Sequence, residues 1–475
     1  MIGSGVWAGV LGGGVGVPQT AWADDVVTDW NAVMGDVLVG NESLQNPGMS
    51  SRSMAMVNLA IYDSLKLGVG GDGSSFYDYG STLGSLGSTA SREAAAAQAA
   101  YTVLSHIYGD QQATLDAQLS ASLSAFSDGA AKTDGIAMGT LIGQSIINRR
   151  ENDGYDTNVQ YTPTNAVGRW QVDPLNPDQE AWGPAWGEVQ TFAVKDVNDF
   201  MPPTMPSLDS AAYAEAYNEV KALGSVDSTT RTSEQTEIGI FWAYDRVGMG
   251  TPMRLFNDAL RTIADDQGNT LDENAELFAK ASVAMADAGI VAWNSKFEFD
   301  LWRPVTGIRD GDLDGNAATV ADADWTPLGA PDGEALTGFT PPFPTYLSGH
   351  ATFGGAVFGV LQEFYGTDDI AFSLTSEELA VILADEELRE LYGLDEDTDA
   401  VREFESLSEA MAENGRSRVY LGIHWNFDDT EGQITGASIA SYLFSNDFVA
   451  VPEPATALLL TVGVVLMRGG RRRRG

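Results

Sequence analysis

The chain has 475 residues, of which 44% are hydrophobic and 20% are charged, so it can bury a substantial core. Its 67 acidic residues against 26 Lys and Arg give a net charge of −41, which argues against a nucleic-acid partner. The absence of cysteine excludes disulfides, thiolate metal sites and a cysteine nucleophile.

The first 23 residues have the character of an export signal. They are apolar and rich in glycine, and Ala21-Trp22-Ala23 before Asp24 is typical of a small-x-small cleavage site. The basic segment that usually begins such a signal is missing. We therefore expect residues 1–23 to be a signal-like segment of an exported protein.

Helical periodicity dominates the rest of the chain. The pattern predicts helices over residues 51–65, 91–108, 112–126, 134–150, 209–223, 233–243, 252–264, 273–293, 350–365, 376–392, 401–420 and 431–444. Strand-like alternation is scarce, which favours a mainly α, bundle-type fold. Residues 155–206 are rich in Pro and Trp and predict an ordered loop packed by aromatic side chains, or a domain junction. A second irregular region is expected over residues 310–344, and we place a soft domain boundary near residue 228.

Three short motifs in the second half of the chain combine Lys, Arg and His. They are Lys-x6-Arg-Pro, Ser-Gly-His and Ser-Arg-x5-His-x3-Asp, and their key positions are Lys296, Arg303, Pro304, Ser348, Gly349, His350, Arg418, His424 and Asp428. Arginine offers an oxyanion two parallel charge-assisted bonds, and a helix N-terminus such as the one expected after Gly349 also attracts anions. If the first motif is helical, Lys296 and Arg303 converge on one anion and Pro304 ends the element. The set predicts a site for a tetrahedral oxyanion.

Two of the three histidines are candidate site residues, and the third is not. A neutral ring nitrogen of His424 can attack or ligate the anion if an acceptor holds its other N–H. Asp428 is the candidate acceptor if the segment is helical, and backbone carbonyls are the alternative. His350 is expected on the opposite side of the anion. His106, on an Ala-rich helix, is expected to be an ordinary surface or core residue.

The order and spacing of these motifs resemble the signature shared by vanadium-dependent haloperoxidases and type 2 phosphatidic acid phosphatases. Residues 341–358, 417–428 and 293–296 are similar to the fungal-type chloroperoxidase branch in particular. The resemblance covers roughly residues 230–445. It implies a helical bundle of the haloperoxidase/acid phosphatase type with long irregular loops. Residues 229–450 would then be the catalytic bundle and residues 24–228 an N-terminal helical region.

The resemblance further implies a vanadate cofactor, with hydrogen peroxide and halide as substrates. His424 would bind vanadium, and vanadate oxygens would be neutralised by Lys296, Arg303, Ser348, Gly349 and Arg418. His350 would act as acid and base, Lys296 would also polarise peroxide, and Asp245 would steady a site arginine or His350. Trp293 and Phe343 would wall a halide pocket.

Two other functions stay open at this point. An acid phosphatase would use nearly the same pocket, with His424 as nucleophile and His350 as general acid. A surface-anchored structural protein with an inactive site would suit the acidic surface. One departure from the family is Leu347, because proline commonly precedes Ser-Gly-His there, and its loss is expected to soften the turn.

A weaker pattern predicts calcium. Asp310, Asp312, Asp314 and Asn316 alternate as oxygen ligands do in a calcium loop, with Gly315 among them. The twelfth position is Ala321 rather than glutamate. An acidic surface loop is the equal alternative.

The C-terminal residues 451–475 resemble a PEP-CTERM sorting tail. Pro452-Glu453-Pro454 precedes an apolar run over residues 455–467 and an arginine-rich end. The resemblance implies transient membrane anchoring through residues 455–467, cleavage by a sorting peptidase, and a cell-surface or extracellular location in a Gram-negative bacterium. A plain C-terminal membrane anchor is the alternative, and an oligomer is compatible with the sequence.

Overall fold

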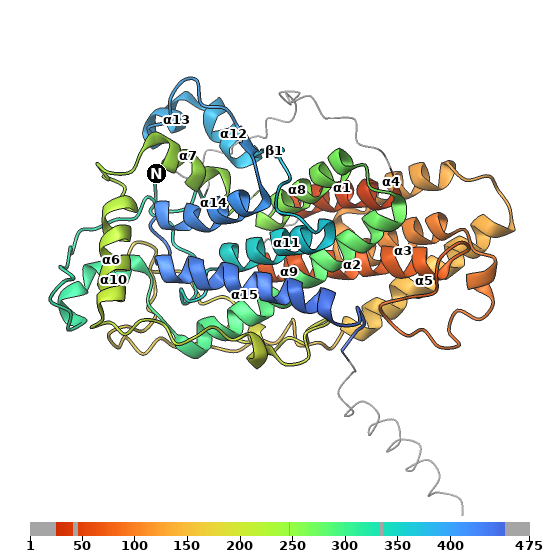
Figure 1. Cartoon of the computed structure of the whole chain (residues 1–475), viewed down its shortest axis with the longest axis horizontal. Coiled ribbons are helices and arrows are strands. Elements are labelled where there is room, and N and C mark those ends of the chain that lie inside the picture. Colours follow the sequence, from red (N-terminus) through yellow and green to blue (C-terminus); the bar gives the residue numbers. More distant parts are fainter. Residues whose placement is uncertain (1–24, 41–45, 247, 333–335, 452–475) are drawn as a thin grey trace, which may run out of the picture.

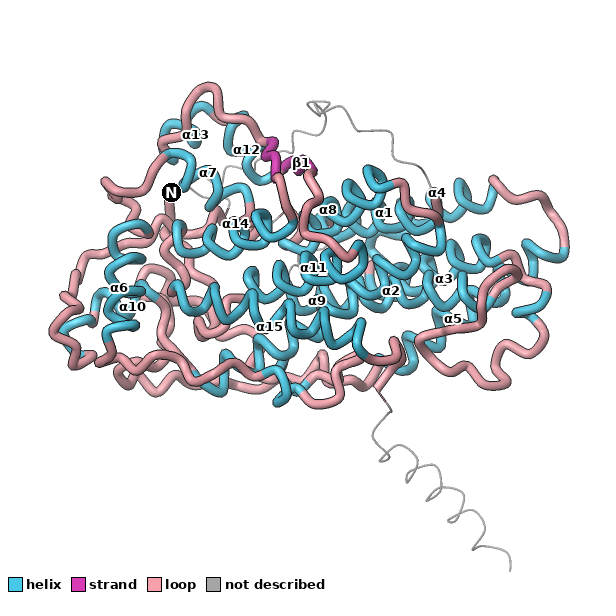
Figure 2. Tube along the Cα trace, in the orientation of Figure 1, coloured by secondary structure: helices cyan, strands magenta, loops and turns pink. Residues whose placement is uncertain are grey.

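The computed structural model describes residues 25–40, 46–246, 248–332 and 336–451. The signal-like segment 1–23 and the sorting tail from residue 452 onward lie outside the described residues. Figure 1 shows an elongated body in which the longest helices run along its long axis, and Figure 2 shows loops along one edge and at both ends. Among the described helices, none is long and apolar enough to cross a membrane.

The described α-helices and strands follow one another in a simple order. The first half carries α1 (Val26–Val39), α2 (Pro47–Leu67), α3 (Arg92–Ile107), α4 (Gln112–Ser124), α5 (Ala130–Arg150), α6 (Ala211–Leu223) and α7 (Ser233–Phe241). The second carries α8 (Pro252–Gln267), α9 (Leu271–Phe299), α10 (Pro304–Arg309), α11 (Gly349–Tyr365), β1 (Phe372–Thr375), α12 (Glu377–Ala384), α13 (Glu386–Tyr392), β2 (Val401–Phe404), α14 (Leu407–Tyr420) and α15 (Asn426–Ser445).

Helix α9 is the central element of the bundle. It begins with a capping box, in which Thr270 and Glu273 satisfy each other's backbone N–H groups. Most of its 29 residues are buried, because α2, α11 and α15 all pack against it. It ends at Phe299, and Asp300 follows in the left-handed conformation with φ of 53°. That turn changes the chain direction between Lys296 and Arg303.

One hydrophobic core runs through both halves of the described chain. It includes Val27 of α1, Leu443 of α15 and much of α9 between them. A second cluster gathers Tyr213 and Tyr217 of α6 with Trp302 and Trp425. The first core crosses the boundary expected near residue 228, and the ranges 24–228 and 229–450 stay a prediction.

Three expectations for local structure need correction. Residues 376–392 form two helices rather than one, because Asp385 caps a new helix by accepting the N–H groups of Glu387 and Leu388. Residues 401–404 are strand β2, paired antiparallel with β1, and the expected helix begins only after the Ser406 cap. Pro304 does not end an element but begins α10, where its missing N–H is harmless. Helices α1 and α10 were not predicted.

The Pro/Trp-rich loop over residues 155–206 is ordered, as expected, and contains only short 3-10 helices. Trp170 and Trp186 are buried in it. The carboxylate of Asp287, on α9, accepts the backbone N–H groups of residues 192, 193 and 194 at 2.6, 2.8 and 2.8 Å. This buried carboxylate therefore holds residues 192–194 of the loop against the central helix.

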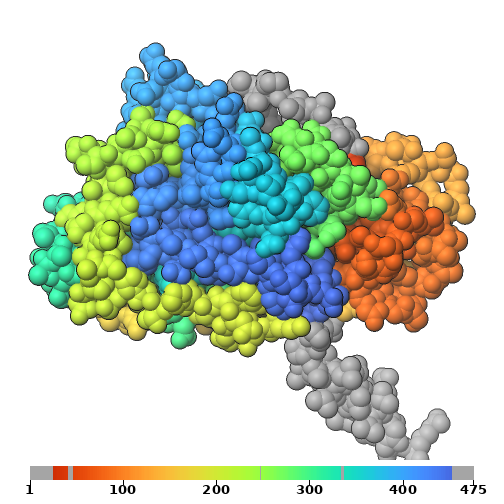
Figure 3. Space-filling model, in the orientation of Figure 1, coloured from red at the N-terminus to blue at the C-terminus, as the bar shows by residue number. Residues whose placement is uncertain are grey.

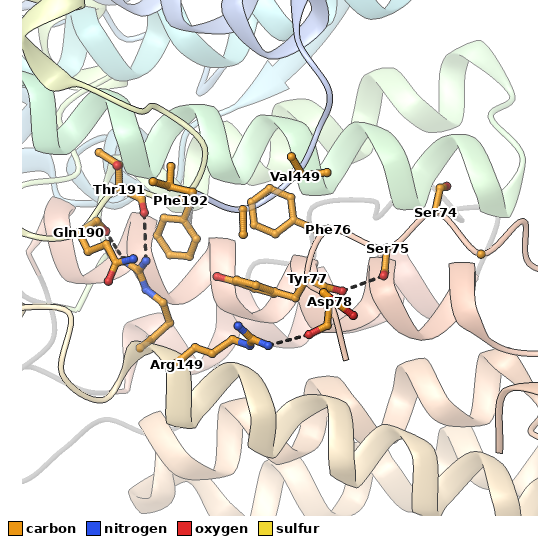
Figure 4. A pocket seen from close by; sticks show the side chains of 14 residues that line it. Ser74, Ser75, Phe76, Tyr77, Asp78, Arg149, Gln190, Thr191, Phe192 and Val449 are labelled. Atoms are coloured by element: carbon orange, nitrogen blue, oxygen red, sulfur yellow. Dashed lines mark hydrogen bonds between the residues drawn. The ribbon is translucent and has the colours of Figure 1, made fainter. Parts of the chain in front are cut away.

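The last described residues return to the first half of the chain. Ala450 and Val451 donate their N–H groups to the carbonyls of Phe76 and Phe192 at 3.1 and 2.9 Å, and Figure 3 shows the dark-blue C-terminal surface against the orange N-terminal one. A cavity of about 560 Å³ lies here (Figure 4). Arg149 at its edge donates to the Asp78 carbonyl at 2.7 Å. None of the motif residues lines this cavity.

Candidate active site

Residues of the second and third motifs line a cavity of about 250 Å³. Lys296 and Ser348 are not among its lining residues, and Arg303 of the first motif is linked to it through its contact with His424. Gly349 and His350 reach it from the start of α11, Arg418 from the end of α14, and His424 from the turn before α15. Other predicted residues that line it are Trp293, Phe343 and Asp245. The sequence spacing thus corresponds to one site in space.

His424 is buried and held at both ring nitrogens. Its Nε2 lies 3.0 Å from Nη1 of Arg303, and its Nδ1 lies 2.9 Å from Oδ2 of Asp428. Because a guanidinium has donors only, Nε2 accepts, and the neutral ring carries its proton on Nδ1. Burial and then Arg303 lower the pKa of His424 well below its ordinary value, which favours this neutral form.

Asp428 contacts His424 as expected, but the two residues do not lie on one face of a helix. His424 lies before α15, whereas Asp428 is the third residue of that helix and folds back to accept the N–H of Trp425 at 3.0 Å. This capping geometry carries the carboxylate to the imidazole. Burial raises the pKa of Asp428 to about 7, and its bond from Thr345 opposes that rise.

His350 is fixed by backbone carbonyls. Its Nε2 lies 3.1 and 2.9 Å from the carbonyl oxygens of Trp242 and Ala243, so Nε2 carries the proton and Nδ1 is left to accept one. Burial and the neighbouring charge of Arg418 lower the pKa of His350 to about 3. The ring is therefore neutral, and its Nδ1 can accept a hydrogen bond.

Asp245 pairs with the site arginine, as the sequence predicted. Its Oδ2 accepts from Nη2 of Arg418 at 2.6 Å. The other two guanidinium nitrogens of Arg418, Nε and Nη1, are buried and have no hydrogen-bond partner within the described part of the chain. The same holds for Nη2 of Arg303. Buried unpaired donors are costly. A bound oxyanion, with several acceptor oxygens, would satisfy them.

Lys296 occupies the site differently from the prediction. Its ammonium is fully buried and donates to the carbonyl oxygens of Pro344 and Thr345 at 3.2 and 3.0 Å, and to that of Leu347. Burial and then Arg303 lower its pKa well below the ordinary value. An ammonium has three donors. In this arrangement Lys296 supports the loop before Ser348, because all three donors are used there.

Ser348 and Gly349 begin helix α11 as expected. The Ser348 hydroxyl accepts the N–H of Ala351, which leaves its hydrogen free to donate. The turn before it carries Leu347 in place of the family's common proline. Two hydrogen bonds hold this turn in place. Lys296 donates to the Leu347 carbonyl, and the Ser348 N–H donates to the Asp428 carbonyl at 3.1 Å.

Aromatic rings form the apolar wall of the cavity. The rings of Trp293 and Phe343 lie 5.0 Å apart, and Trp182 contacts them at 5.0 and 6.3 Å. Trp182 was not singled out from the sequence, although the Pro/Trp-rich composition of its loop was noted. The second residue that was missed is Thr345, whose hydroxyl contacts both His424 and Asp428. It lies within the quoted segment 341–358, but hydroxyl residues are too common to stand out.

The predicted calcium loop does not gather its carboxylates. Asp314 accepts from the Asn316 N–H and the Thr319 hydroxyl at 2.7 Å each, and Asp312 accepts the Ala321 N–H. Across the described residues, no group of three acidic or histidine side chains could hold a metal ion. Asp312 and Asp314 thus bond within the loop itself, and the calcium site stays a prediction. His106 is exposed on α3, as expected for a bystander.

Comparison with known proteins gives consistent matches. The family model described as the VCPO second helical-bundle domain matches residues 276–448. A vanadium chloroperoxidase of Curvularia inaequalis is 38% identical over 310 residues, which cover 56% of this chain and 50% of that protein. The chain thus matches about half the length of this curated relative.

Two solved bacterial structures share the fold. A vanadium-dependent iodoperoxidase superposes with a TM-score of 0.69 at 23% identity, covering 90% of this chain and 98% of the other. A holo-type vanadium-dependent chloroperoxidase gives 0.63 at 16% identity, covering 90% and 97%.

The protein therefore has the mainly α fold of the vanadium-dependent haloperoxidases, which confirms the expected fold class. Within it, residues 276–448 match the model of the VCPO second helical-bundle domain, and this match includes all three motifs, so the resemblance seen in them is confirmed.

Proposed function

We propose that this protein is a vanadate-dependent haloperoxidase that oxidises a halide with hydrogen peroxide to hypohalous acid or a halogenated product. The observation that carries the proposal is the neutral His424 ring with its Nε2 lone pair turned toward Arg303, beside the unpaired N–H groups of Arg303 and Arg418. The 38% identity to a vanadium chloroperoxidase over 310 residues supports it.

The residues present fit vanadate as the cofactor. His424 Nε2 would ligate vanadium, and the free guanidinium N–H groups of Arg303 and Arg418 would bind its oxygens, as would the Ser348 hydroxyl and the Gly349 backbone. When bound, vanadate supplies a Lewis acid that activates peroxide without changing its own oxidation state. Lys296 would hold the loop before Ser348 in place through the carbonyls of Thr345 and Leu347.

Other side chains around the proposed vanadate would accept a proton, orient an arginine and exclude water. His350 would take a proton on Nδ1 from incoming peroxide, because Nε2 is committed to the carbonyls of residues 242 and 243. Asp245 would hold the Arg418 guanidinium in its orientation. The rings of Trp293, Phe343 and Trp182 would strip water from a small halide.

Acid phosphatase activity is the second candidate, and one observation favours it. A neutral histidine with its Nδ1–H on a carboxylate and an unprotonated Nε2 is also the arrangement of a nucleophile that attacks phosphorus. The unpaired arginine donors would suit phosphate equally well. The two activities must therefore be assayed together.

Export and tail processing remain part of the proposal and rest on the sequence alone. We propose that residues 1–23 direct export and that a sorting peptidase removes a tail beginning near residue 452, leaving the protein at the cell surface or outside a Gram-negative bacterium. The contacts of Ala450 and Val451 with the body would leave the catalytic bundle intact after such a cut.

The decisive assay measures halide oxidation by peroxide beside hydrolysis of a phosphate ester, before and after vanadate is added. We expect vanadate-dependent halide oxidation that His424→Ala abolishes, while His106→Ala, on the exposed face of α3, leaves it unchanged. Hydrolysis alone would support the phosphatase. Neither activity, with no vanadate uptake, would support a structural protein with an inactive site.

A further inference from the structure

A hydroxyl group contacts both members of the His424–Asp428 pair. Thr345 Oγ1 lies 2.9 Å from His424 Nδ1, and it donates a short hydrogen bond to Oδ2 of Asp428. Thr345 is completely buried. It lies in the loop before Ser348, outside the three motifs.

The direction of each bond follows from Arg303. Since Arg303 can only donate to His424 Nε2, the neutral ring keeps its proton on Nδ1 and donates it to Asp428. The Thr345 hydroxyl hydrogen then points to the same carboxylate oxygen, and its lone pairs face the Nδ1–H. Oδ2 of Asp428 accepts three donors in all, including the Trp425 N–H at 3.0 Å.

The backbone of Thr345 is fixed on both sides. Its N–H donates to the Leu301 carbonyl at 3.0 Å, and its own carbonyl accepts from Lys296 Nζ at 3.0 Å. A β-branched side chain on a fixed backbone has few rotamers. The hydroxyl is therefore held against the pair and cannot easily turn away.

We propose that Thr345 is a positioning residue that keeps His424 in the Nδ1–H form, so that Nε2 presents its lone pair to an oxyanion. The inference rests on the proposed function of His424. If the hydroxyl is lost, Asp428 loses one of three donors and the Nδ1–H loses one of its two acceptors. Arg303 then remains as the group that disfavours a proton on Nε2, and the ring protonated on Nε2 gains population. Such a ring cannot ligate vanadium or attack phosphorus.

The test reads the ring protons directly. The chain has only three histidines, so the ¹⁵N-histidine NMR spectrum of the full chain without vanadate contains three pairs of ring signals. Single His106→Gln and His350→Gln variants identify those two residues. We expect His424 to show a protonated Nδ1 and a bare Nε2 in the wild type and in Thr345→Ser. In Thr345→Val, which keeps the shape but not the hydroxyl, we expect a mixture of both forms.

A binding measurement accompanies the spectrum. Thr345→Val is expected to weaken vanadate and inorganic phosphate binding by about 10- to 100-fold, the usual loss when a partner of a ligating histidine is removed, and Thr345→Ser is expected to restore it. A Thr345→Val protein with a pure Nδ1–H ring and wild-type affinity would overturn the inference. Should Thr345→Val fail to fold, Thr345→Ser decides alone, because loss of the Nδ1–H form there also overturns it. A wild type that binds neither anion refutes the proposed function instead, and the NMR spectrum still decides the role of Thr345.

Discussion

The ion pair between Arg418 and Asp245 shows how single residues prepare this site. One guanidinium nitrogen is bound by the carboxylate at 2.6 Å, while two others stay buried and unpaired. Such partial satisfaction fixes the direction of the remaining donors. The guanidinium donors are thereby held in the orientation that the proposed oxyanion would need.

The first prediction concerns this ion pair. Asp245→Asn keeps the shape of the side chain but removes the charge that orients Arg418. We expect vanadate affinity to fall by about 10-fold or more, as for other partners of anion-binding and ligating groups. Equilibrium binding of vanadate measures it, and Asp312→Asn in the surface loop is the matched control. Unchanged affinity in Asp245→Asn would show that Arg418 needs no orienting carboxylate.

Site residues of types that few other positions carry, such as histidine, could be predicted from the sequence. Site residues of common types could not. Arg303, Arg418, His350 and His424 were predicted because oxyanion chemistry needs those side chains at those spacings. Thr345 and Trp182 were missed, because their roles arise only when loops distant in sequence meet. Lys296 was predicted to bind the anion, but the left-handed turn at Asp300 and the loop carbonyls that bind its ammonium were not foreseen.

At the scale of elements, the loop over residues 155–206 completes the cavity. The N–H of Trp182 donates to the Pro342 carbonyl at 2.9 Å, which places its ring on Trp293. Gly183 follows with φ of 77°, and a Cβ there would lie 2.5 Å from Nε1 of Trp293. Only glycine allows so close an approach.

Trp182 should therefore act on the halide more than on the cofactor. In Trp182→Ala the cavity opens to water, so the halide keeps more of its hydration shell. We expect the KM for halide to rise with vanadate affinity unchanged, and Trp182→Phe to recover most of the loss. Steady-state kinetics with saturating vanadate measures it, with Trp170→Phe in the same loop as control. A uniform loss of vanadate binding would instead indicate a general structural role.

The carboxylate of Asp287 fastens the same loop to α9. Asp287→Ala would leave three backbone N–H groups without their acceptor. We expect the free energy of unfolding to fall by about 2–4 kcal/mol, because hydrogen bonds to a charged group are worth more than neutral ones. Chemical denaturation measures this loss, and limited proteolysis should cut near residues 190–194 sooner than in the wild type. Equal stability would mean that the aromatic packing alone holds the loop.

Helix ends and strand pairing mark the limit of what local sequence could predict for the elements. Periodicity located most long helices, because the buried faces of a bundle repeat at helical spacing. It could not detect the break at Asp385, which depends on a side-chain cap, or strand β2, which depends on pairing with β1.

At the scale of the whole molecule, the site is built from more than the matched domain. Residues 276–448 supply both histidines and both arginines, whereas Trp182 and Asp245 come from before that range. One core connects these parts. Truncation to the matched domain would therefore remove two walls of the cavity.

Stability should depend on pH in an unusual direction. Burial raises the pKa of Asp63 to about 7 and that of Glu378 to about 7 as well. The folded chain thus holds protons that the unfolded chain has released, so stability present below the ordinary carboxyl pKa is lost as pH rises toward neutrality. The net charge of −41 acts in the same direction through self-repulsion.

We accordingly expect the free energy of unfolding to be larger near pH 5 than near pH 8, which lie on either side of the raised pKa values. High salt should remove the part due to repulsion and leave the part due to buried carboxyls, and Asp63→Asn should reduce the latter. Denaturant titrations at both pH values measure it. Greater stability at the higher pH would refute this account.

The most direct test of the central claim is the anomalous diffraction signal of vanadium in crystals of the full chain grown with vanadate. We predict one peak inside the cavity, bonded to Nε2 of His424, with oxygens in hydrogen-bond contact with Arg303 and Arg418. A peak elsewhere in the molecule, or an equal peak in crystals of His424→Ala, would contradict it.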